Sequence, residues 1–541
     1  MLSKIEILLD KILAVKIGFA ELAMNFLGII VLRVFEERFL ASVDQAVYGT
    51  INGFLYNFFF FVVLYLLLWI LLSFLLKRSP MQLSGLILWS FWLVLLPPVF
   101  DMIKTGGSVY WSFYSLNGLA GLWLQYTTFF GHLPSGIVYF GTKIIFLLTI
   151  FLVAGVIFVK TKKLWKTLLG AFATYSIMFV LGTLPSWLAI VFYFFAGSKN
   201  ISQVNEIDVA QLFGTSKPIF GIVNEGVRYA FTNNLNLFYF LLMGFLLIVV
   251  CILEDRQKTW SMAKNARLPQ IIYHAGLFLA GIGLGVFFYP QNWHLNIFAI
   301  ETGIVILWSI CLAWLASVAV NDLNDLEIDK LTNSDRPLQM NVFTRQEYAN
   351  LGRVLFALSL LGGVVVGLKF AMLLLVYQIF AWLYSARPFR LKRFPVIATF
   401  FSALASVIVI FVGFSLFSGD DNIRLFPWRI TFLMLAALTL SLPIKDFKDV
   451  VGDKADGVWT IPVLFGMEMG KIIVASGIFI SFMLSVFFLN EKKLFWWALI
   501  LGGINFLIVT GKKTKPQQMM WLVLGVTFIY AIVLAEILFI K

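Results

Sequence analysis

Residues 297–329 read IFAIETGIVILWSICLAWLASVAVNDLNDLEID, so a long, mainly apolar run ends at Val320 and an aspartate-rich segment follows at once. The apolar run is long enough to cross a hydrocarbon core of about 30 Å as a helix. Ionisable groups at the end of such a helix are costly to keep near lipid, and they mark a functional site by default. This stretch therefore predicts a membrane helix that delivers acidic side chains to one membrane surface.

The composition extends this prediction to the whole chain. Of the 541 residues, 61% are hydrophobic and 13% are charged, well below the roughly 25% of charged residues in a soluble domain. Apolar stretches of membrane-spanning length recur along the chain. The sequence therefore predicts an all-α polytopic membrane protein.

A polar, basic stretch at 254–270 divides the apolar segments into two sets. We predict a cytoplasmic linker there, between an N-terminal multi-span membrane domain of unknown function at 1–253 and a second membrane domain at 271–541. The N-terminal domain has five predicted spans, at 54–76, 84–100, 136–159, 166–196 and 235–253. The second domain has nine, at 274–290, 297–320, 351–368, 370–386, 396–417, 428–445, 471–489, 494–511 and 519–540.

The formal net charge of +13 comes mainly from lysines and arginines in short loops between the predicted spans. This distribution is the positive-inside pattern of membrane proteins, so we expect membrane lipids and no nucleic acid as partners. The basic loops alternate with loops that are poor in lysine and arginine. The asymmetry predicts that residues 321–329 lie on the cytoplasmic side of a multi-pass protein in a plasma membrane of bacterial or archaeal type.

A second acidic segment, Lys445-Asp-Phe-Lys-Asp-Val-Val-Gly-Asp453, follows another apolar stretch, and an even number of predicted spans places it on the same side. On a helix, residues three or four apart share a face. Each segment would therefore present several oxygen-bearing side chains on one stripe: Asn321, Asp322, Asp325 and Asp329 in the first, and Asp446, Asp449 and Asp453 in the second.

Carboxylates that are held close together repel one another strongly in a low-dielectric site. A divalent cation removes that cost, and Mg²⁺ binds through a few carboxylates together with substrate phosphates. The two segments thus predict a Mg²⁺ site that holds a diphosphate. The alternative is that these acids are ordinary surface charges, or first-turn residues that the helix dipole favours.

A basic loop, Tyr384-Ser-Ala-Arg-Pro-Phe-Arg-Leu-Lys-Arg393, closes a span on the same predicted side. Arginine and lysine can grip phosphate oxygens, so Arg387, Arg390 and Lys392 are candidate diphosphate ligands. The topology rule alone would also place basic residues here, and Tyr384 could equally be an interfacial tyrosine.

Four motifs in this order resemble the UbiA family of intramembrane prenyltransferases over residues 265–541. They are Asn-Asp-x-x-Asp-x-x-x-Asp at 321–329, Asn333-Ser-Asp-Arg-Pro-Leu338, the loop from Tyr384 to Lys392, and Lys445 to Asp453 with Thr460-Ile-Pro462. The resemblance implies a nine-helix bundle with a central cavity that two Asp-rich loops cap. It also implies Mg²⁺-dependent transfer of an isoprenoid chain from a prenyl diphosphate donor to a small aromatic or hydroxyl-bearing lipid precursor.

The resemblance further implies roles for individual residues. The metal ligands would be Asn321, Asp325 and Asp329 from the first segment and Asp449 and Asp453 from the second, with Asp322 and Asp446 as supporting ligands or as groups that hold the ligands. The substrate-binding residues would be Arg267, Arg336, Arg387, Arg390, Lys392 and Lys445. Asp325, Asp449, Tyr384 and Lys392 would be the catalytic residues, with Tyr384 and Lys392 contacting the diphosphate or orienting the acceptor.

One stretch departs from the family pattern. After Arg336-Pro-Leu338 the family continues with a small residue, a glycine and a basic residue, whereas this chain has Gln339-Met-Asn-Val342. Asn341 can adopt the left-handed conformation that a glycine would supply, but the basic residue is missing. The acceptor, the length of the donor chain and any protein partner of residues 1–253 are left open by the sequence.

Three other classes of protein carry acidic segments of this kind. A transporter or channel would bury acids in mid-span at broken helices, whereas these acids lie at span ends. A non-catalytic scaffold could use the acidic loops for ion binding, but the retained aspartate and asparagine ligands argue against a catalytically dead site. A soluble terpenoid synthase also uses Asp-rich helices, but the hydropathy of the chain excludes it.

Overall fold

The computed structural model describes residues 2–40, 51–106, 118–131, 140–214, 219–222, 227–419, 426–455, 457–512 and 514–539. Over these ranges the chain forms helices joined by turns, and its β structure is confined to one isolated bridge between Ile219 and Ile222. Thirteen of the described helical segments are long and apolar enough to cross a membrane. The predicted all-α polytopic membrane fold is therefore confirmed.

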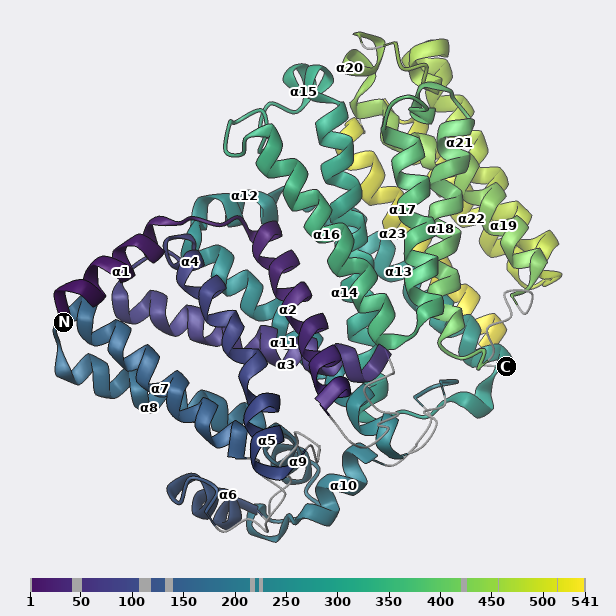
Figure 1. Cartoon of the computed structure of the whole chain (residues 1–541). Coiled ribbons are helices and arrows are strands. Elements are labelled where there is room, and N and C mark those ends of the chain that lie inside the picture. The colour runs from purple at the N-terminus through teal and green to yellow at the C-terminus, as the bar shows by residue number, and fades with distance from the viewer. Residues whose placement is uncertain are drawn as a thin grey trace. The chain divides into compact units, whose positions relative to one another are not determined.

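The chain divides into two compact units (Figure 1), one made of Met1–Lys217 and Val223–Thr259 and the other of Pro218–Ile222 and Trp260–Lys541. The first unit contains α1 (Leu2–Ala14), α2 (Phe19–Leu40), α3 (Ile51–Leu76), α4 (Pro80–Ser90), α5 (Leu96–Thr105), α6 (Gly118–Thr127), α7 (Phe140–Thr161), α8 (Leu164–Gly182), α9 (Leu184–Phe195), α10 (Glu206–Gly214) and α11 (Val227–Glu254). Helix α12 (Arg256–Lys264) lies within the predicted linker. The cytoplasmic side of that linker stays a prediction.

Within the first unit, α3 packs against α8 and α11, and α7 packs against α8. Five described segments of this unit have the length and apolarity of a span. The prediction of a single span at 166–196 is wrong in one respect, because the chain forms two helices there, α8 and α9. Pro185 lies in the first turn of α9, where its missing N–H leaves no interior hydrogen bond unmade.

The second unit contains α13 (Leu268–Phe288), α14 (Ile297–Asn324), α15 (Leu326–Thr332), α16 (Arg345–Val366), α17 (Leu368–Ser385), α18 (Ile397–Ser415), α19 (Trp428–Ser441), α20 (Val450–Ala455), α21 (Ile461–Leu489), α22 (Leu494–Thr510) and α23 (Pro516–Phe539). Each of the nine predicted spans corresponds to one of the long apolar helices. Two of them are short: α19 has 14 residues and continues into a turn of 3₁₀-helix at Leu442–Lys448, and α22 has 17 residues, at the lower end of the length that crosses a hydrocarbon core.

Close backbone contact joins α13 to α18. A Cβ atom added to Gly281 would lie 2.0 Å from the carbonyl oxygen of Ile410, and one added to Gly413 would lie 2.3 Å from that of Phe278. Helices in lipid associate through such small residues, because the hydrophobic effect does not drive them together there. These glycines therefore set the separation of two helices of the bundle.

A short segment that includes residues 219–222 packs within the second unit, although it precedes the predicted domain boundary. The N–H of Gly221 donates to the carbonyl oxygen of Leu416 at 2.9 Å. The rings of Phe220 and Trp293 lie 4.7 and 5.9 Å from that of Phe417, centroid to centroid. The sequence contained no signal for this excursion.

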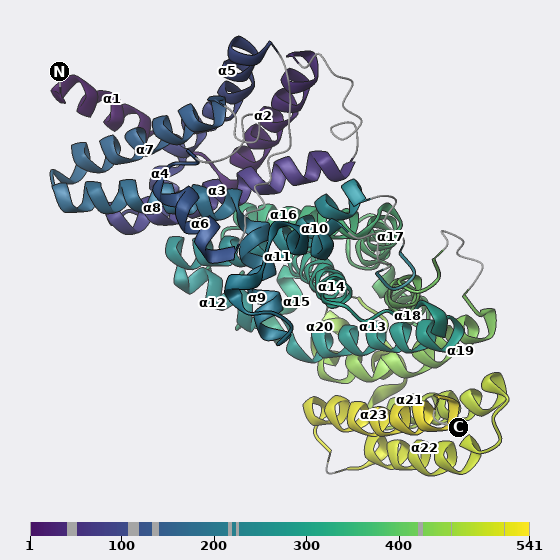
Figure 2. The same cartoon turned by 90° about the horizontal axis from the view of Figure 1, so that it is seen from below.

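Two short helices bring the acidic segments together. Helix α15 follows the end of α14, and α20 follows the turn of 3₁₀-helix at Leu442–Lys448. The two views agree that α15 and α20 lie side by side at one end of the second unit (Figures 1 and 2), and their residues are in contact. The fold thus places α15, which continues the first acidic segment, next to α20 of the second.

Candidate functional site

The first acidic segment is interrupted at Asp325. This residue has φ −109° and ψ 21°, and it ends α14 and begins α15. The N–H of Asp325 still donates to the carbonyl oxygen of Asn321 at 3.0 Å, and that of Asp329 donates to the carbonyl oxygen of Asp325 at 2.9 Å. The predicted spacing of four residues is therefore kept, although the predicted unbroken helix is not.

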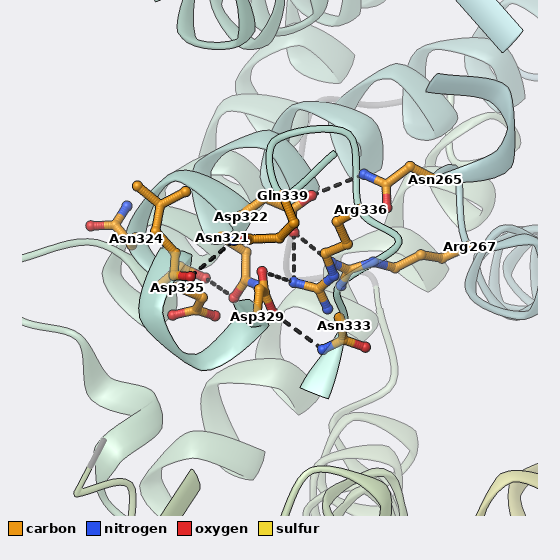
Figure 3. A network of polar contacts seen from close by, with 12 residues as sticks. Asn265, Arg267, Asn321, Asp322, Asn324, Asp325, Asp329, Asn333, Arg336 and Gln339 are labelled. Atoms are coloured by element: carbon orange, nitrogen blue, oxygen red, sulfur yellow. Dashed lines mark hydrogen bonds and ion pairs between the residues drawn. The ribbon is translucent and has the colours of Figure 1, made fainter. Parts of the chain in front are cut away.

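Asp322 lies at the centre of a polar network (Figure 3) and is only 1% exposed. Its Oδ1 accepts hydrogen bonds from Arg267 Nη2 at 2.6 Å and from Arg336 Nη1 at 3.0 Å. Its Oδ2 accepts from Asn265 Nδ2 and from the Tyr348 hydroxyl, both at 2.9 Å. Two predicted substrate-binding arginines are thus engaged with this carboxylate.

Asp325 is paired with two buried cations from the basic loop. Arg390 Nη2 lies 3.1 Å from Asp325 Oδ1, and Lys392 Nζ pairs with the same oxygen. Burial lowers the pKa of Lys392, and the negative charge of Asp325 opposes that effect. The other carboxylate oxygen, Oδ2, accepts no hydrogen bond from any residue that the structure describes, so it is open to a further cation.

Asp329 is buried beside Arg336, which pairs with its Oδ2, and Asn333 Nδ2 donates to its Oδ1 at 3.2 Å. Burial raises the pKa of Asp329 to about 6. The positive charge of Arg336 lowers this pKa, and the charges of Asp322 and Asp325 raise it. Burial therefore outweighs the arginine in setting the pKa of Asp329.

The charges of the first acidic segment and of the basic loop affect the second acidic segment. Burial, together with the neighbouring carboxylates of Asp446 and Asp449, raises the pKa of Asp453 to about 7. Lys392 lowers the pKa of Asp453, and the charge of Asp325 raises it. Residues from both acidic segments and from the basic loop therefore act on one another electrostatically.

A lysine joins the second segment to the start of the basic loop. Lys445 Nζ donates to the Tyr384 hydroxyl at 3.1 Å and lies 4.9 Å from the centroid of its ring. The same Nζ donates to Ser402 Oγ at 3.4 Å. A cation over an aromatic face is electrostatically favourable. Tyr384 thus faces the interior of the site, where Lys445 holds its hydroxyl.

Some candidate residues lie less centrally, and some residues of the site had no place in the sequence prediction. Arg387 is exposed in the turn after α17 and forms no ion pair among the described residues. Ser385 Oγ donates to Asn321 Oδ1 at 3.1 Å. Asn265 and Tyr348, the donors to Asp322, were also missed, because they belong to no acidic or basic run.

The donor set fits Mg²⁺ by its chemistry. Within the described ranges, no group of three or more Asp, Glu, His or Cys side chains is arranged closely enough to hold a metal ion. The available donors are carboxylate and amide oxygens, which are the ligands that Mg²⁺ prefers. Asp329 and Asp453, whose pKa values are raised, are carboxylates that a divalent cation would stabilise in their ionised form.

Comparison with known proteins agrees with the family resemblance. The model of the UbiA prenyltransferase family matches residues 279–523. The digeranylgeranylglyceryl phosphate synthase of Methanothermobacter thermautotrophicus is 30% identical over 173 residues, which cover 31% of this chain and 57% of that protein. The chloroplastic 2-acyl-4-prenylphloroglucinol 6-prenyltransferase of Humulus lupulus is 30% identical over 203 residues, which cover 35% of this chain and 47% of that protein.

A solved structure is also similar to this chain. It is that of a UbiA homolog from Archaeoglobus fulgidus bound to DMAPP and Mg²⁺, with 21% identity and a TM-score of 0.40. The match covers 49% of this chain and 95% of that one. The chain spans about half the length of the two curated relatives described above.

Proposed function

We propose that the second unit, in which residues 279–523 form a UbiA prenyltransferase family domain, transfers an isoprenoid chain from a prenyl diphosphate to a small acceptor within the membrane. The observation that carries the proposal is that acids and cations gather at one place. The acidic segments meet where α15 contacts α20, and Asp325 of the first segment pairs with Arg390 and Lys392 of the basic loop. Acids that suit Mg²⁺ beside cations that suit phosphate oxygens are what a diphosphate requires. We place this site on the cytoplasmic side of the membrane.

The proposed cofactor is Mg²⁺, and Asn321, Asp325, Asp329, Asp449 and Asp453 would hold it. When bound, it would neutralise negative charge on the departing diphosphate. The carboxylates themselves could not neutralise this charge, because each of them repels the diphosphate.

The remaining residues bind and orient the two substrates. Arg390 and Lys392 donate to the diphosphate oxygens while the C–O bond of the donor breaks, and the electron pair leaves with the diphosphate. A hydroxyl or ring carbon of the acceptor attacks the freed carbon, a new C–O or C–C bond forms, and the acceptor's proton passes to the departing diphosphate. Tyr384, held by Lys445, orients the acceptor. The lipid-embedded bundle keeps water out, so hydrolysis does not compete.

The acceptor we propose is a small hydroxyl-bearing or aromatic lipid precursor. The names of the two curated relatives point to a glyceryl phosphate in one case and to a phloroglucinol in the other. Both classes offer a nucleophilic oxygen or ring carbon. The missing basic residue after Leu338 removes one cation that could otherwise select an anionic acceptor.

The test is a transfer assay with the full-length chain in nanodiscs. The protein is incubated with Mg²⁺, labelled prenyl diphosphates of several lengths and a panel of acceptors of both classes, and products are identified by mass spectrometry. We expect one prenylated product, which disappears in excess EDTA and in Asp449→Asn. Glu327→Gln is the matched control, because Glu327 is exposed and, among the residues that the structure describes, pairs only with the exposed Lys330 on the same segment. Prenyl diphosphate binding that persists undiminished in EDTA would refute the proposal.

A further inference from the structure

We propose that Asp322 is a positioning residue and not a metal ligand, and that it couples the chain leading into α13 to the metal-binding segment. This inference rests on the proposed function. Asp322 lies in the last turn of α14, directly after Asn321 and three residues before Asp325. Figure 3 shows Asn265, Arg267 and Arg336 converging on its carboxylate.

The carboxylate of Asp322 has no free capacity. A carboxylate offers about four lone-pair sites, and each oxygen of Asp322 accepts two hydrogen bonds from protein donors. With 1% of the residue exposed, water does not reach it. A metal ion could bind only by displacing Arg267, Arg336, Asn265 or Tyr348, and the displaced group would lose its hydrogen bond to this carboxylate.

Other acids of the site differ from Asp322 in this respect. Asp325 has one oxygen, Oδ2, that accepts no hydrogen bond from the described part of the chain. Asp453 accepts none there on either oxygen, and burial together with the neighbouring carboxylates raises its pKa. Asp325 and Asp453 are therefore open to a cation, whereas Asp322 is already saturated by protein donors.

The donors to Asp322 come from three separate parts of the second unit. Asn265 and Arg267 precede α13 and lie 57 and 55 residues before Asp322. Arg336 follows α15, and Tyr348 lies in the first turns of α16, 14 and 26 residues after Asp322. Asn265 also donates to the Tyr348 hydroxyl at 2.9 Å, so these two donors and Asp322 form a closed triangle.

The backbone at Arg267 indicates that these contacts constrain the chain. Arg267 has φ 55° and ψ 65°, the left-handed conformation, at the residue that begins α13. A residue other than glycine keeps such a conformation only where its surroundings hold it. The ion pair with Asp322 provides that hold. Residues 265–267, which lie within the predicted linker, thus act on Asn321 and Asp325 through Asp322.

The experiment measures Mn²⁺ binding, with Mn²⁺ replacing Mg²⁺ as a paramagnetic probe, to the full-length chain in nanodiscs in the presence of inorganic pyrophosphate. Titration followed by electron paramagnetic resonance gives the number of bound ions and their affinity. We expect Asp322→Asn to bind as many ions as the wild type with an affinity about tenfold lower, as for residues that orient metal ligands. Asp325→Asn should lose a bound ion, and Glu327→Gln should match the wild type.

The donors of Asp322 provide the decisive comparison, and they keep the test valid if Asp322→Asn fails to fold. Tyr348→Phe and Asn265→Ala should weaken Mn²⁺ binding in the same direction. The double variant of Asp322→Asn and Tyr348→Phe should be no weaker than Asp322→Asn alone, because the two residues act through one contact. A metal ligand would behave otherwise, since loss of its protein donors would leave the ligand in place.

Two results would overturn the inference while the proposed function stands. One is loss of a bound ion in Asp322→Asn with wild-type binding in Tyr348→Phe and Asn265→Ala. The other is wild-type binding in all three variants. A wild-type chain that binds no Mn²⁺ with pyrophosphate would instead reject the proposed function, and this inference with it.

Discussion

Replacing Asp325 by asparagine removes a negative charge that faces two buried cations. The side chains of Arg390 and Lys392 are 2% and 9% exposed, and both pair with Asp325 Oδ1. Removing one partner of a buried ion pair costs about 3–5 kcal/mol, because a buried charge is left without compensation. Lys392, whose pKa burial already lowers, can release its proton to limit this cost. We therefore expect Asp325→Asn to lower the free energy of unfolding by about 3 kcal/mol.

The assay is unfolding in mixed micelles, followed through the fluorescence of the 17 tryptophans. Lys392→Met should also be destabilising, since it leaves Asp325 with one cation fewer. The double variant should be more stable than Asp325→Asn alone, because the buried charge of Lys392 is removed together with its partner, although Arg390 still loses its ion pair with Asp325. The double-mutant cycle should therefore give a coupling of about 2 kcal/mol or more. Transfer activity should be lost in all three variants, so recovered stability would not restore function.

Three outcomes would contradict this reasoning. Additive losses in the double variant would mean that Asp325 and Lys392 do not stabilise each other. An Asp325→Asn variant as stable as the wild type would mean that the buried ion pair does not contribute to the free energy of unfolding. Full transfer activity in Asp325→Asn would refute its role as a metal ligand, with Glu327→Gln again serving as the control.

Three further predictions concern metal, pH and packing. Excess EDTA should abolish the binding of inorganic pyrophosphate to the full-length chain in calorimetry, and binding that survives would count against Mg²⁺. The affinity for Mg²⁺ should rise from about pH 6 and level off above about pH 7. Asp329 and Asp453 hold protons below pKa values of about 6 and 7, and only the ionised carboxylates bind metal. An affinity for Mg²⁺ that does not change with pH would contradict this prediction. Gly281→Leu should destabilise the second unit by about 1–3 kcal/mol or more, because a Cβ atom there would lie 2.0 Å from the carbonyl oxygen of Ile410. Gly276→Leu, on the same helix and with open space around it, should have no such effect on unfolding.

Local patterns in the chain were sufficient to predict the long helices and to place the acidic residues at the ends of those helices. Lipid offers no partner for backbone N–H and C=O groups, so a long apolar run such as 297–320 must satisfy them within a helix. The four-residue spacing of Asn321, Asp325 and Asp329 also follows from the sequence, and the backbone hydrogen bonds preserve it through the break at Asp325. The break itself was not foreseen.

Packing alone determined which cation meets which acid. Lys392 reaches Asp325 across 67 residues, and Asn265 and Tyr348 meet at Asp322 from opposite sides of it in the chain. Any of the basic residues near the site could have paired with any of the acids, because all of the basic residues carry the same positive charge. The choice depends on how α13, α14, α16 and α17 pack, and such long-range geometry leaves no local signature in a single sequence.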